Sequence, residues 1–476
     1  MLAALVALAA SCGGSPSEQR LLTGGLPPGA IPPAPKPEDI ERSAEHQRLV
    51  EAYGGVYEFK KIEDIAAGLV SRLVGASDQP QTPVKVTILN SPAVNAFALP
   101  DGELYITRGL TALANDESEL AAVIAHELAH VTQDHARQRQ RQQRAAALAR
   151  RVSDVVADPE VKLETREVAE LSRATFSQRQ ELQADAMGVN TLANAGFDPF
   201  AAARFLQSMA RYSSLPAVSA TRGRGAGFLS SHPSTPNRVA QAKRVARSHA
   251  APGLGVTQRD RYLKSLDGML YGDDPHRGYV RGREFANVKL GIAFEVPEGY
   301  ALRNTADAVL ATDGQNTAIR FDTVSVPDSQ SLSEYLASGW VKGLIPDTIR
   351  KTTLRGLEAA TASALVDGWS FRIAAVRGPR GVYRFIFASS QPAAAYEDAF
   401  RRTLASFKIM SPSDRAALRP LRIRIVEVQP TDTIESLSAR MDGVEGPLKQ
   451  TLFETLNGLG EDRTLRPGML VKLVME

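Results

Sequence analysis

The spacing of apolar and polar positions separates stretches of helical character from stretches of extended character. Residues 117–143 and 177–196 are rich in strong helix formers, and each predicts a helix. The first stretch contains neither proline nor glycine and follows Asn115 and Asp116, which are placed to cap it. The sequence therefore predicts two helices whose centres lie about 50 residues apart along the chain.

Short apolar runs typical of strands occupy other parts of the chain. Residues 84–90 and 97–107 predict strands, with a turn at 100–102 between short apolar arms. Farther on, strands and helices over 277–410 predict an α+β domain with an antiparallel sheet and helices on one face. The expected strands are 288–297, 317–326, 370–376 and 382–389, and the expected helical stretches are 331–340 and 395–407.

The first residues of the chain have the features of an export signal. Residues 2–10 form an apolar stretch too short to span a bilayer but long enough for the core of a signal peptide. Small residues then lead to Cys12, which resembles the lipidated cysteine of a bacterial lipobox. Residues 13–38 are rich in glycine, proline and serine and predict an extended tether. The resemblance implies a lipoprotein of the periplasm, anchored to the outer membrane.

The length, charge and cysteine count of the chain limit the number of domains and the kinds of partner and site that it can have. A chain of 476 residues suggests about three domains. The net charge is only +3, because 56 basic residues nearly cancel 53 acidic ones, so no nucleic-acid partner is expected. The arginines after residue 136 predict a solvated helix face, since no aromatic residue lies among them. A single cysteine excludes a disulfide framework and any cysteine-rich zinc site.

The strongest chemical signal is the sequence HELAH at residues 126–130. On a helix, His126 and His130 are one turn apart and leave the same face, so both imidazoles can bind one metal ion. Glu127 lies one step around the helix, where its carboxylate can reach a water on an open coordination position. This arrangement is typical of a catalytic zinc site in which a glutamate is the general base.

Such a site needs a third protein ligand, and the second predicted helix offers two carboxylates. Glu181 and Asp185 are four residues apart and share one face. Ala184 and Gly188 are small and would let this helix approach the first closely. We expect Glu181 to be the third ligand and Asp185 to hold an imidazole through its other ring nitrogen. From spacing alone, ordinary surface salt bridges remain an equal alternative.

These motifs, with the upstream sequence NAFALPDGELYITRGL, resemble the gluzincin metallopeptidases that include the CAAX prenyl proteases and the HtpX-type proteases. The resemblance covers about residues 40–250. It implies that His126, His130 and Glu181 bind one Zn²⁺ per chain, that Glu127 is the catalytic base and that Asp185 supports the ligands. The chain resembles a soluble, exported branch of that family, with a mainly helical zincin-type domain over 39–260 and a small sheet with an edge strand.

Three further features near the expected site carry weaker signals. The edge strand of a zincin pairs with an extended substrate, and Asn95, Ala96, Phe97 and Ala98 are candidates for it, although a plain core hairpin would show the same pattern. His232 and Arg238 resemble a family motif near the active site, where either residue could stabilise the oxyanion; His232 could also be a surface loop residue. His135 is expected to hydrogen-bond at a helix boundary rather than to bind the same metal.

The last part of the chain, 418–476, predicts a strand, two helices and a strand. It resembles LysM, a small peptidoglycan-binding module, but residues 429–433 lack the glycine that this family usually has in its first turn. Peptidoglycan binding and a purely structural role therefore remain equal alternatives.

The sequence as a whole predicts a multidomain α+β protein that is a zinc metalloendopeptidase. Its expected partners are polypeptide substrates, misfolded envelope proteins among them, peptidoglycan if the last module binds it, and a membrane only through the lipid anchor. Because a motif match is a hypothesis, two alternative functions remain. One is a peptidoglycan-associated scaffold or chaperone with a latent peptidase site, and the other is a CAAX-type protease acting on prenylated substrates.

Overall fold

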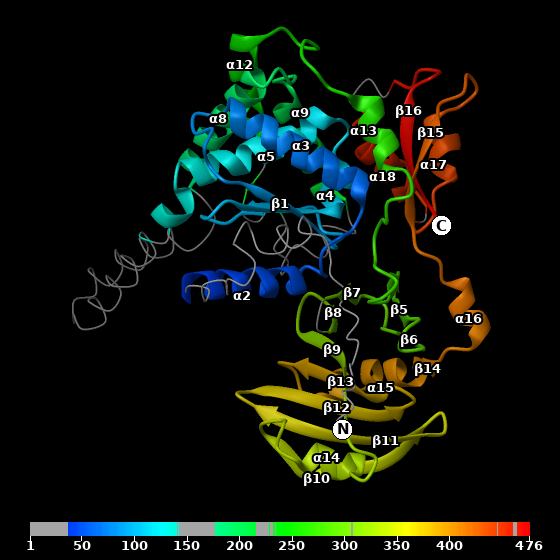
Figure 1. Cartoon of the computed structure of the whole chain (residues 1–476). Helices are drawn as coiled ribbons and strands as arrows, with labels where there is room; N and C mark the ends of the chain where they lie inside the picture. Colours follow the sequence, from blue (N-terminus) through cyan, green and yellow to red (C-terminus); the bar gives the residue numbers. More distant parts are fainter. Residues whose placement is uncertain are drawn as a thin grey trace, which may run out of the picture. The chain divides into compact units, whose positions relative to one another are not determined.

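The computed structural model describes residues 37–139, 141, 177–215, 228, 232, 233, 235–305, 308–444, 446–459 and 464–476 (Figure 1). The signal peptide expected over 1–12, its Cys12 and nearly all of the expected tether lie outside these residues. The chain divides into two compact units, Met1–Glu51 and Ala52–Glu476. Helix α2 (Pro37–Ala52) accounts for the described part of the first unit. None of the described helices combines the length and the apolar character needed to cross a bilayer.

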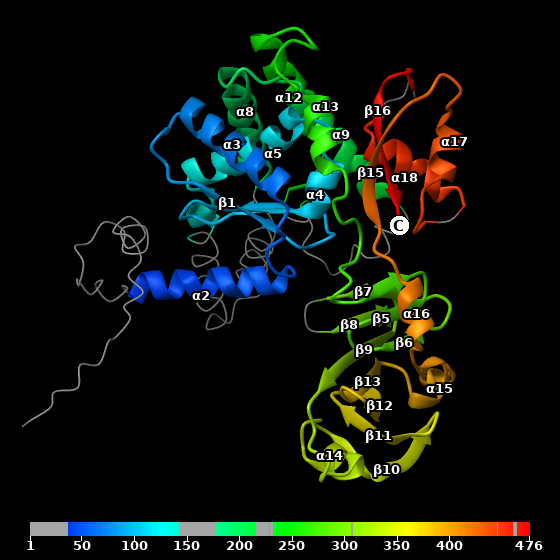
Figure 2. The same ribbon diagram turned by 45° about the vertical axis from the view of Figure 1, so that its right-hand side comes forward.

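The predicted peptidase region is a group of helices packed beside a small sheet (Figures 1 and 2). The two predicted helices are present as α5 (Glu117–Thr132) and α8 (Gln178–Asn194), and they pack against each other. Asp116 caps α5 by accepting a hydrogen bond from the Glu119 amide, and Ser177 forms a capping box with Gln180. Other helices within the described part of this region are α3 (Lys60–Ala76), α4 (Arg108–Leu113), α9 (Ala201–Ser214), α12 (Pro236–His249) and α13 (Arg259–Leu266).

Helix α5 is shorter than the sequence predicts, because it ends at Thr132 and not near residue 143. Asp134 adopts a left-handed backbone conformation with φ 54°, which an α-helix cannot continue through and which aspartate tolerates better than most residues. Helical turns resume at 135–139 after this break. The predicted single helix is therefore two helical segments with a change of direction between them.

The small sheet contains the two predicted strand regions. Its strands are β1 (Lys85–Leu89), β2 (Ala96–Ala98) and β3 (Glu103–Thr107), in the order β1-β3-β2. β2 and β3 form the predicted antiparallel hairpin, while β1 and β3 are parallel. Gly102 is required in this turn, since its φ is 92° and a Cβ there would lie 1.9 Å from the Pro83 carbonyl oxygen. The hairpin leaves β2 at one edge of the sheet.

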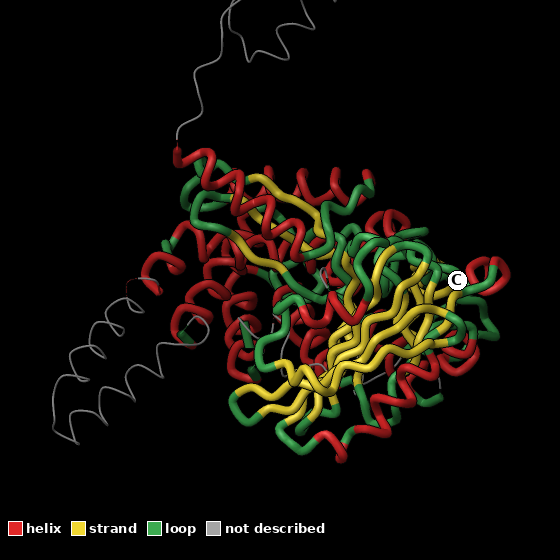
Figure 3. Tube along the Cα trace, turned by 90° about the horizontal axis from the view of Figure 1, so that it is seen from below, coloured by secondary structure: helices red, strands yellow, loops and turns green. Residues whose placement is uncertain are grey.

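The predicted α+β domain is built on a seven-stranded antiparallel sheet (Figure 3), with the strand order β10-β11-β12-β13-β9-β8-β7. The strands are β7 (Ala301–Asn304), β8 (Val309–Thr312), β9 (Thr317–Val324), β10 (Leu344–Leu354), β11 (Leu357–Val366), β12 (Trp369–Gly378) and β13 (Gly381–Ser389). A four-stranded sheet in the order β14-β6-β5-β4 accompanies it. Its strands are β4 (Tyr279–Arg281), β5 (Glu284–Asn287), β6 (Ile292–Glu295) and β14 (Lys408–Ile409).

The helices of this domain are not on one face of the sheet, which corrects the expectation from sequence. Helix α15 (Glu397–Ser406) shares a core with Ala374 and Phe385, whereas α14 (Leu332–Ala337) shares another with Ile373 and Ile386. Successive residues of a strand point to opposite faces, so these two cores lie on opposite sides of the sheet. The remaining short helices are η1 (Ala393–Ala395) and α16 (Pro412–Ala417).

The C-terminal residues form the predicted order of strand, two helices and strand. These elements are β15 (Arg422–Glu427), α17 (Ile434–Ala439), α18 (Leu448–Leu456) and β16 (Leu470–Met475), and the two strands pair antiparallel. Their apolar side chains belong to the same hydrophobic core as α3 and α5. The described residues of the C-terminal module therefore pack into the peptidase region and share its core.

Candidate metal centre

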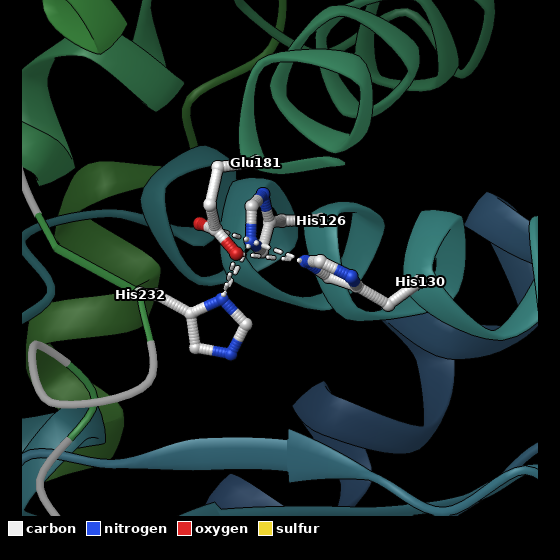
Figure 4. A group of neighbouring side chains, drawn as sticks. All are labelled: His126, His130, Glu181 and His232. Atoms are coloured by element: carbon white, nitrogen blue, oxygen red, sulfur yellow. Dashed lines mark hydrogen bonds and ion pairs between the residues drawn. The ribbon is translucent and has the colours of Figure 1, made fainter. Parts of the chain in front are cut away.

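The two histidines of the HELAH sequence point to one place in the interior. His126 and His130 lie on adjacent turns of α5, and their Nε2 atoms are 3.1 Å apart (Figure 4). Both side chains are buried, as is almost all of α5. The structure thus brings together the pair that the helical spacing predicted.

Helix α8 brings the expected third ligand to the same point. Glu181 lies with one carboxylate oxygen 3.4 Å from His130 Nε2 and the other 3.6 Å from His126 Nε2. The two helices approach closely at Gly188, where a Cβ atom would lie 3.2 Å from the His126 amide nitrogen. This agrees with the expectation that a small residue at 188 allows the carboxylate to reach the imidazoles.

Replacing Gly188 by valine should separate these two helices. We expect the free energy of unfolding to fall by about 1–3 kcal/mol, because the added methyl groups meet the backbone of α5. Metal affinity should fall too, because Glu181 is displaced from the histidines. Chemical denaturation and zinc titration measure the two effects. Gly68→Val on α3 is the matched control, since nothing lies within 4 Å of a Cβ there; an equal loss in both variants would refute the packing argument.

His232, from the loop before α12, completes the group. Its Nδ1 lies 2.9 Å from Glu181 Oε1 and 3.2 Å from His126 Nε2. The candidate ligand atoms of His126, His130, Glu181 and His232 all lie within 4.8 Å of one another. The expectation from sequence placed His232 near the site as a stabiliser of the oxyanion, whereas the geometry adds it to the possible metal ligands.

The chemistry of this group fits a metal ion. Three imidazole nitrogens and a carboxylate face one another in a buried space. His126 Nε2 lies near a nitrogen of His130 and a nitrogen of His232, and a single proton can form a hydrogen bond in only one of these two pairs at a time. A cation at the centre would satisfy all of these nitrogens together. Burial lowers the pKa of His130 well below its ordinary value, so the ring favours the neutral form that binds metals. Nitrogen and oxygen donors in this number are typical of tetrahedral zinc.

Asp185 and Arg238 support the ligands from behind. Asp185 Oδ1 lies 3.1 Å from His126 Nδ1, which is the contact expected from sequence. Arg238 donates from Nε and Nη2 to the two Asp185 oxygens, both at 2.7 Å, and its Nη1 lies 2.7 Å from Glu181 Oε2. Nη1 also donates to the Pro233 carbonyl, so the expectation that Arg238 faces a substrate oxyanion does not fit these contacts.

These contacts set the charge of the site. Burial would raise the pKa of Asp185, but hydrogen bonds from Arg238 and His126 lower it overall. In Glu181 the effect of burial is likewise outweighed by hydrogen bonds from His130 and His232, which leave its pKa below the ordinary value. Both carboxylates are therefore held ionised, as ligation and support of a cation require.

Glu127 is placed differently from the carboxylates that are held ionised. Its side chain is 2% exposed, and burial raises its pKa. Its Oε1 lies 3.7 Å from His232 Nε2, on the side of that ring away from the other ligand atoms. A buried carboxyl with a raised pKa beside a candidate metal centre has the properties that a general base needs in order to take up a proton and return it.

His135 does not belong to the group of ligands. The break at Asp134 turns it back toward α5, where its Nδ1 lies 3.0 Å from Nδ1 of His130. This agrees with the expected hydrogen bond at a helix boundary. His135 thereby orients the ring of His130 through the nitrogen that faces away from the site.

The predicted edge strand lies close to this group through Phe228. The Phe228 amide donates to the Val94 carbonyl, just before β2, and its ring stacks on His232 with centroids 4.5 Å apart. Asn95 is anchored by hydrogen bonds to Tyr53 and Thr107, and Phe97 stacks on Tyr105. The sequence alone gave no role to Phe228, because a single phenylalanine carries no motif.

Comparison with known proteins agrees with this geometry. Residues 60–246 match peptidase family M48, within the 40–250 range of the expected resemblance. The matched range contains His126, His130, Glu181 and His232, the residues of the buried donor group. The C-terminal module, 418–476, lies outside the matched range.

Several curated relatives are similar over the same region. The beta-barrel assembly-enhancing protease of Yersinia pestis is 32% identical over 219 residues, which are 43% of this chain and 43% of the relative. That of Escherichia coli (strain K12) is 32% identical over 205 residues, 40% of each chain. The mitochondrial metalloendopeptidase OMA1 of Schizosaccharomyces pombe is 28% identical over 36% of this chain and 49% of the relative. The chain thus spans less than half the length of these relatives.

Among solved structures, the PsbP protein of the cyanobacterium Synechocystis matches 29% of this chain at 14% identity, with a TM-score of only 0.22.

Proposed function

We propose that this chain, in which residues 60–246 match peptidase family M48, is a zinc-dependent endopeptidase acting on misfolded or unfolded proteins of the cell envelope. The observation that carries the proposal is the buried convergence of His126, His130 and Glu181, with Glu127 beside them. A surface cluster of similar composition would have no need of burial or of the Arg238–Asp185 support.

In this proposal His126, His130 and Glu181 hold one Zn²⁺ per chain. When bound, zinc supplies Lewis acidity, which acidifies a water molecule and polarises a peptide carbonyl. Glu127 accepts a proton from the attacking water on a carboxylate oxygen and returns it to the leaving amine. Its buried position raises its pKa and suits both steps. Arg238 and Asp185 keep the ligand side chains in place.

The expected substrate is an extended polypeptide. β2 is an edge strand, and an extended chain can pair with the backbone of such an edge largely independently of its sequence. The segment Asn95–Ala98 leads into and forms this strand and is connected to His232 through Phe228. The name of the bacterial relatives, beta-barrel assembly-enhancing protease, supports substrates of the envelope.

Location and further partners follow from the two ends of the chain. Lipidation of Cys12 would anchor the protein to the outer membrane and leave its body in the periplasm. The C-terminal module has the strand and helix order of LysM, which supports a proposed peptidoglycan contact. The domain over 277–410 would then position substrates or partners.

The proposal is tested with the chain that starts after Cys12. We expect one zinc ion per molecule and cleavage of casein, with both lost after dialysis against a chelator and restored by added Zn²⁺. Metal analysis and gel assays of casein measure this. Cleavage that is unaffected by complete removal of the metal would refute the proposed mechanism. Magnesium in place of zinc gives a control for nonspecific cation effects, because it prefers oxygen ligands.

One observation favours the latent scaffold as a second candidate. With His232 the group has four possible protein ligands, whereas a catalytic zinc site has three and an open position. A chain that binds zinc through all four would hold it as a structural centre. In that case the cellular role would survive Glu127→Gln, whereas a protease would lose it.

A further inference from the structure

The last strand of the chain carries a lysine with no exposed surface. Lys472 lies in β16 and is 0% exposed, between apolar neighbours that are equally buried. Its Nζ donates to the carbonyls of Ala112, Leu113 and Ala114, at 2.8, 3.3 and 2.8 Å. Ala112 and Leu113 are the last two residues of α4, and Ala114 is its C-cap. Carbonyls at the end of a helix have no amide partner within that helix. An ammonium group has three N–H donors, so the three contacts use all of them.

The surroundings of Lys472 show that its charge belongs to a buried network. Burial lowers the pKa of Lys472 to about 7, and burial raises that of Glu119 to about 7; the two groups influence each other. The other charged groups that act on Lys472 are Asp116 at the start of α5 and Arg259 of α13. Arg204 of α9 bonds Asp116 and lies 3.5 Å from Glu119, so the acidic side of the network is neutralised from α9 as well.

This network surrounds the turn that leads into the catalytic helix. The carbonyls bound by Lys472 end at Ala114, and Asp116 is the residue that caps α5. Between them, the Asn115 amide donates to Glu119 Oε2 at 2.9 Å. From there α5 runs without a break to His126 and Glu127. The position of this turn therefore sets the start of the helix that carries two ligands and the base.

The rest of the module is attached to the same place. Gly458 touches the turn, because a Cβ there would lie 2.8 Å from Asn115 Nδ2. On the other side, β15 pairs with residues 268–271 through Ile423 N to Met269 O and Tyr271 N to Leu421 O, both at 2.8 Å. Figures 1 and 2 both show the two strands beside α13 and α18 near α4, in agreement with the contacts between these elements.

We infer that Lys472 is a positioning residue for the peptidase site, through which the C-terminal module fixes the end of α4 and the start of α5. This rests on the proposed peptidase function. The module would then be needed for turnover whether or not it binds a glycan. A small shift of the first turn of α5 displaces the side chains farther along it, His126, Glu127 and His130. A displacement of about 1 Å in an active site can lower the rate on the order of 100-fold.

The test compares Lys472→Met with Arg424→Met in the full chain. Arg424 is an exposed cation on β15, opposite Leu473 in the same two-stranded sheet, and controls for loss of positive charge. We expect Lys472→Met to lower kcat for casein by about 10- to 100-fold with KM within twofold, and to speed amide exchange over residues 112–122. Arg424→Met should change neither.

Each outcome decides the inference. Unchanged kcat or unchanged exchange over 112–122 in a folded Lys472→Met variant would overturn it, as would a loss of stability without a change in kcat. Amide exchange needs no activity, so an inactive wild-type chain would refute the peptidase proposal while leaving the positioning of the turn to be judged by exchange.

If Lys472→Met does not fold, a second pair of variants replaces it. Gly458→Ala and Gly446→Ala place the same methyl group at positive φ, 61° and 60°, but only the first meets Asn115. We expect a fall in kcat and faster exchange over 112–122 in Gly458→Ala alone. Equal behaviour of the two variants would overturn the inference.

Discussion

Replacing Glu127 by glutamine should lower kcat for peptide cleavage by about 100- to 10,000-fold while leaving zinc content and the melting temperature unchanged. Glutamine has the shape of glutamate and fits the same buried position, where Oε1 of Glu127 faces His232 Nε2 at 3.7 Å. It cannot accept and return a proton at that atom. Casein cleavage, metal analysis and thermal unfolding of the same preparation measure the three quantities.

The control for this prediction lies on the same helix. Glu117 is the first residue of α5, more than two turns from the ligands, and its carboxylate faces Arg261. Glu117→Gln should therefore retain the wild-type kcat. Near-normal cleavage by Glu127→Gln would show that another group is the base. Loss of zinc in that variant would instead show that Glu127 helps to hold the metal.

Replacing Arg238 by alanine should have the second large effect, on stability. The Arg238 guanidinium is 2% exposed and bonds two buried carboxylates, Asp185 and Glu181. Removing it leaves both without their cation, and breaking a buried pair in this way costs about 3–5 kcal/mol. Zinc affinity should fall by about 10- to 100-fold, because Asp185 no longer holds His126 in place. Urea denaturation of the metal-free chain and competition with a zinc indicator measure the two effects.

Two variants separate this role from a simple loss of charge. Arg247→Ala removes an exposed cation from the same helix, α12, and should be neutral. Arg238→Lys keeps the charge but lacks the planar guanidinium, whose three nitrogens reach the two Asp185 oxygens and Glu181 separately, so we expect only partial recovery. Full stability of Arg238→Ala would mean that the two carboxylates are not held ionised in the folded chain.

The centre of the site could be predicted because it depends on local geometry. His126 and His130 on one helix, and Glu181 and Asp185 on another, are each one turn apart, and helical periodicity alone puts each pair on one face. The small residue Gly188 also indicated the close approach of the two helices. The structure brings Glu181 to within 3.6 Å of the two histidines, and the ligand roles that the family resemblance implied stay predictions.

Contacts between residues that are far apart in the chain could not be predicted from the sequence. Arg238 reaches Asp185 across 53 residues, and nothing in its own surroundings distinguishes a support for a carboxylate from a group that faces substrate. Lys472 is a stronger case, because alternation along a strand would place it on the side opposite Val471 and Leu473, which predicts exposure. It is buried because the peptidase region covers that side of the strand.

Several strands of the α+β domain were not predicted, and for β10 and β11, the longest of them, the cause is local. β10 is exposed along most of its length and β11 is rich in alanine, so neither shows the apolar alternation that predicts a half-buried strand. They are strands because β12 provides a partner for β11, and β11 one for β10. The two helices of this domain have apolar faces that look alike in sequence, and only the packing assigns them to opposite sides.

The pairing of residues 268–271 with β15 changes how the domains of this chain should be counted. Tyr271 donates to the Leu421 carbonyl, so the chain leaves the peptidase region and returns to it at one place, some 150 residues later. The stretch between them is an insertion whose two ends meet, a topology that proteins tolerate well because the host fold is not interrupted. The peptidase region and the C-terminal module therefore share one hydrophobic core that is discontinuous in sequence, because the stretch between residues 271 and 421 is inserted into it.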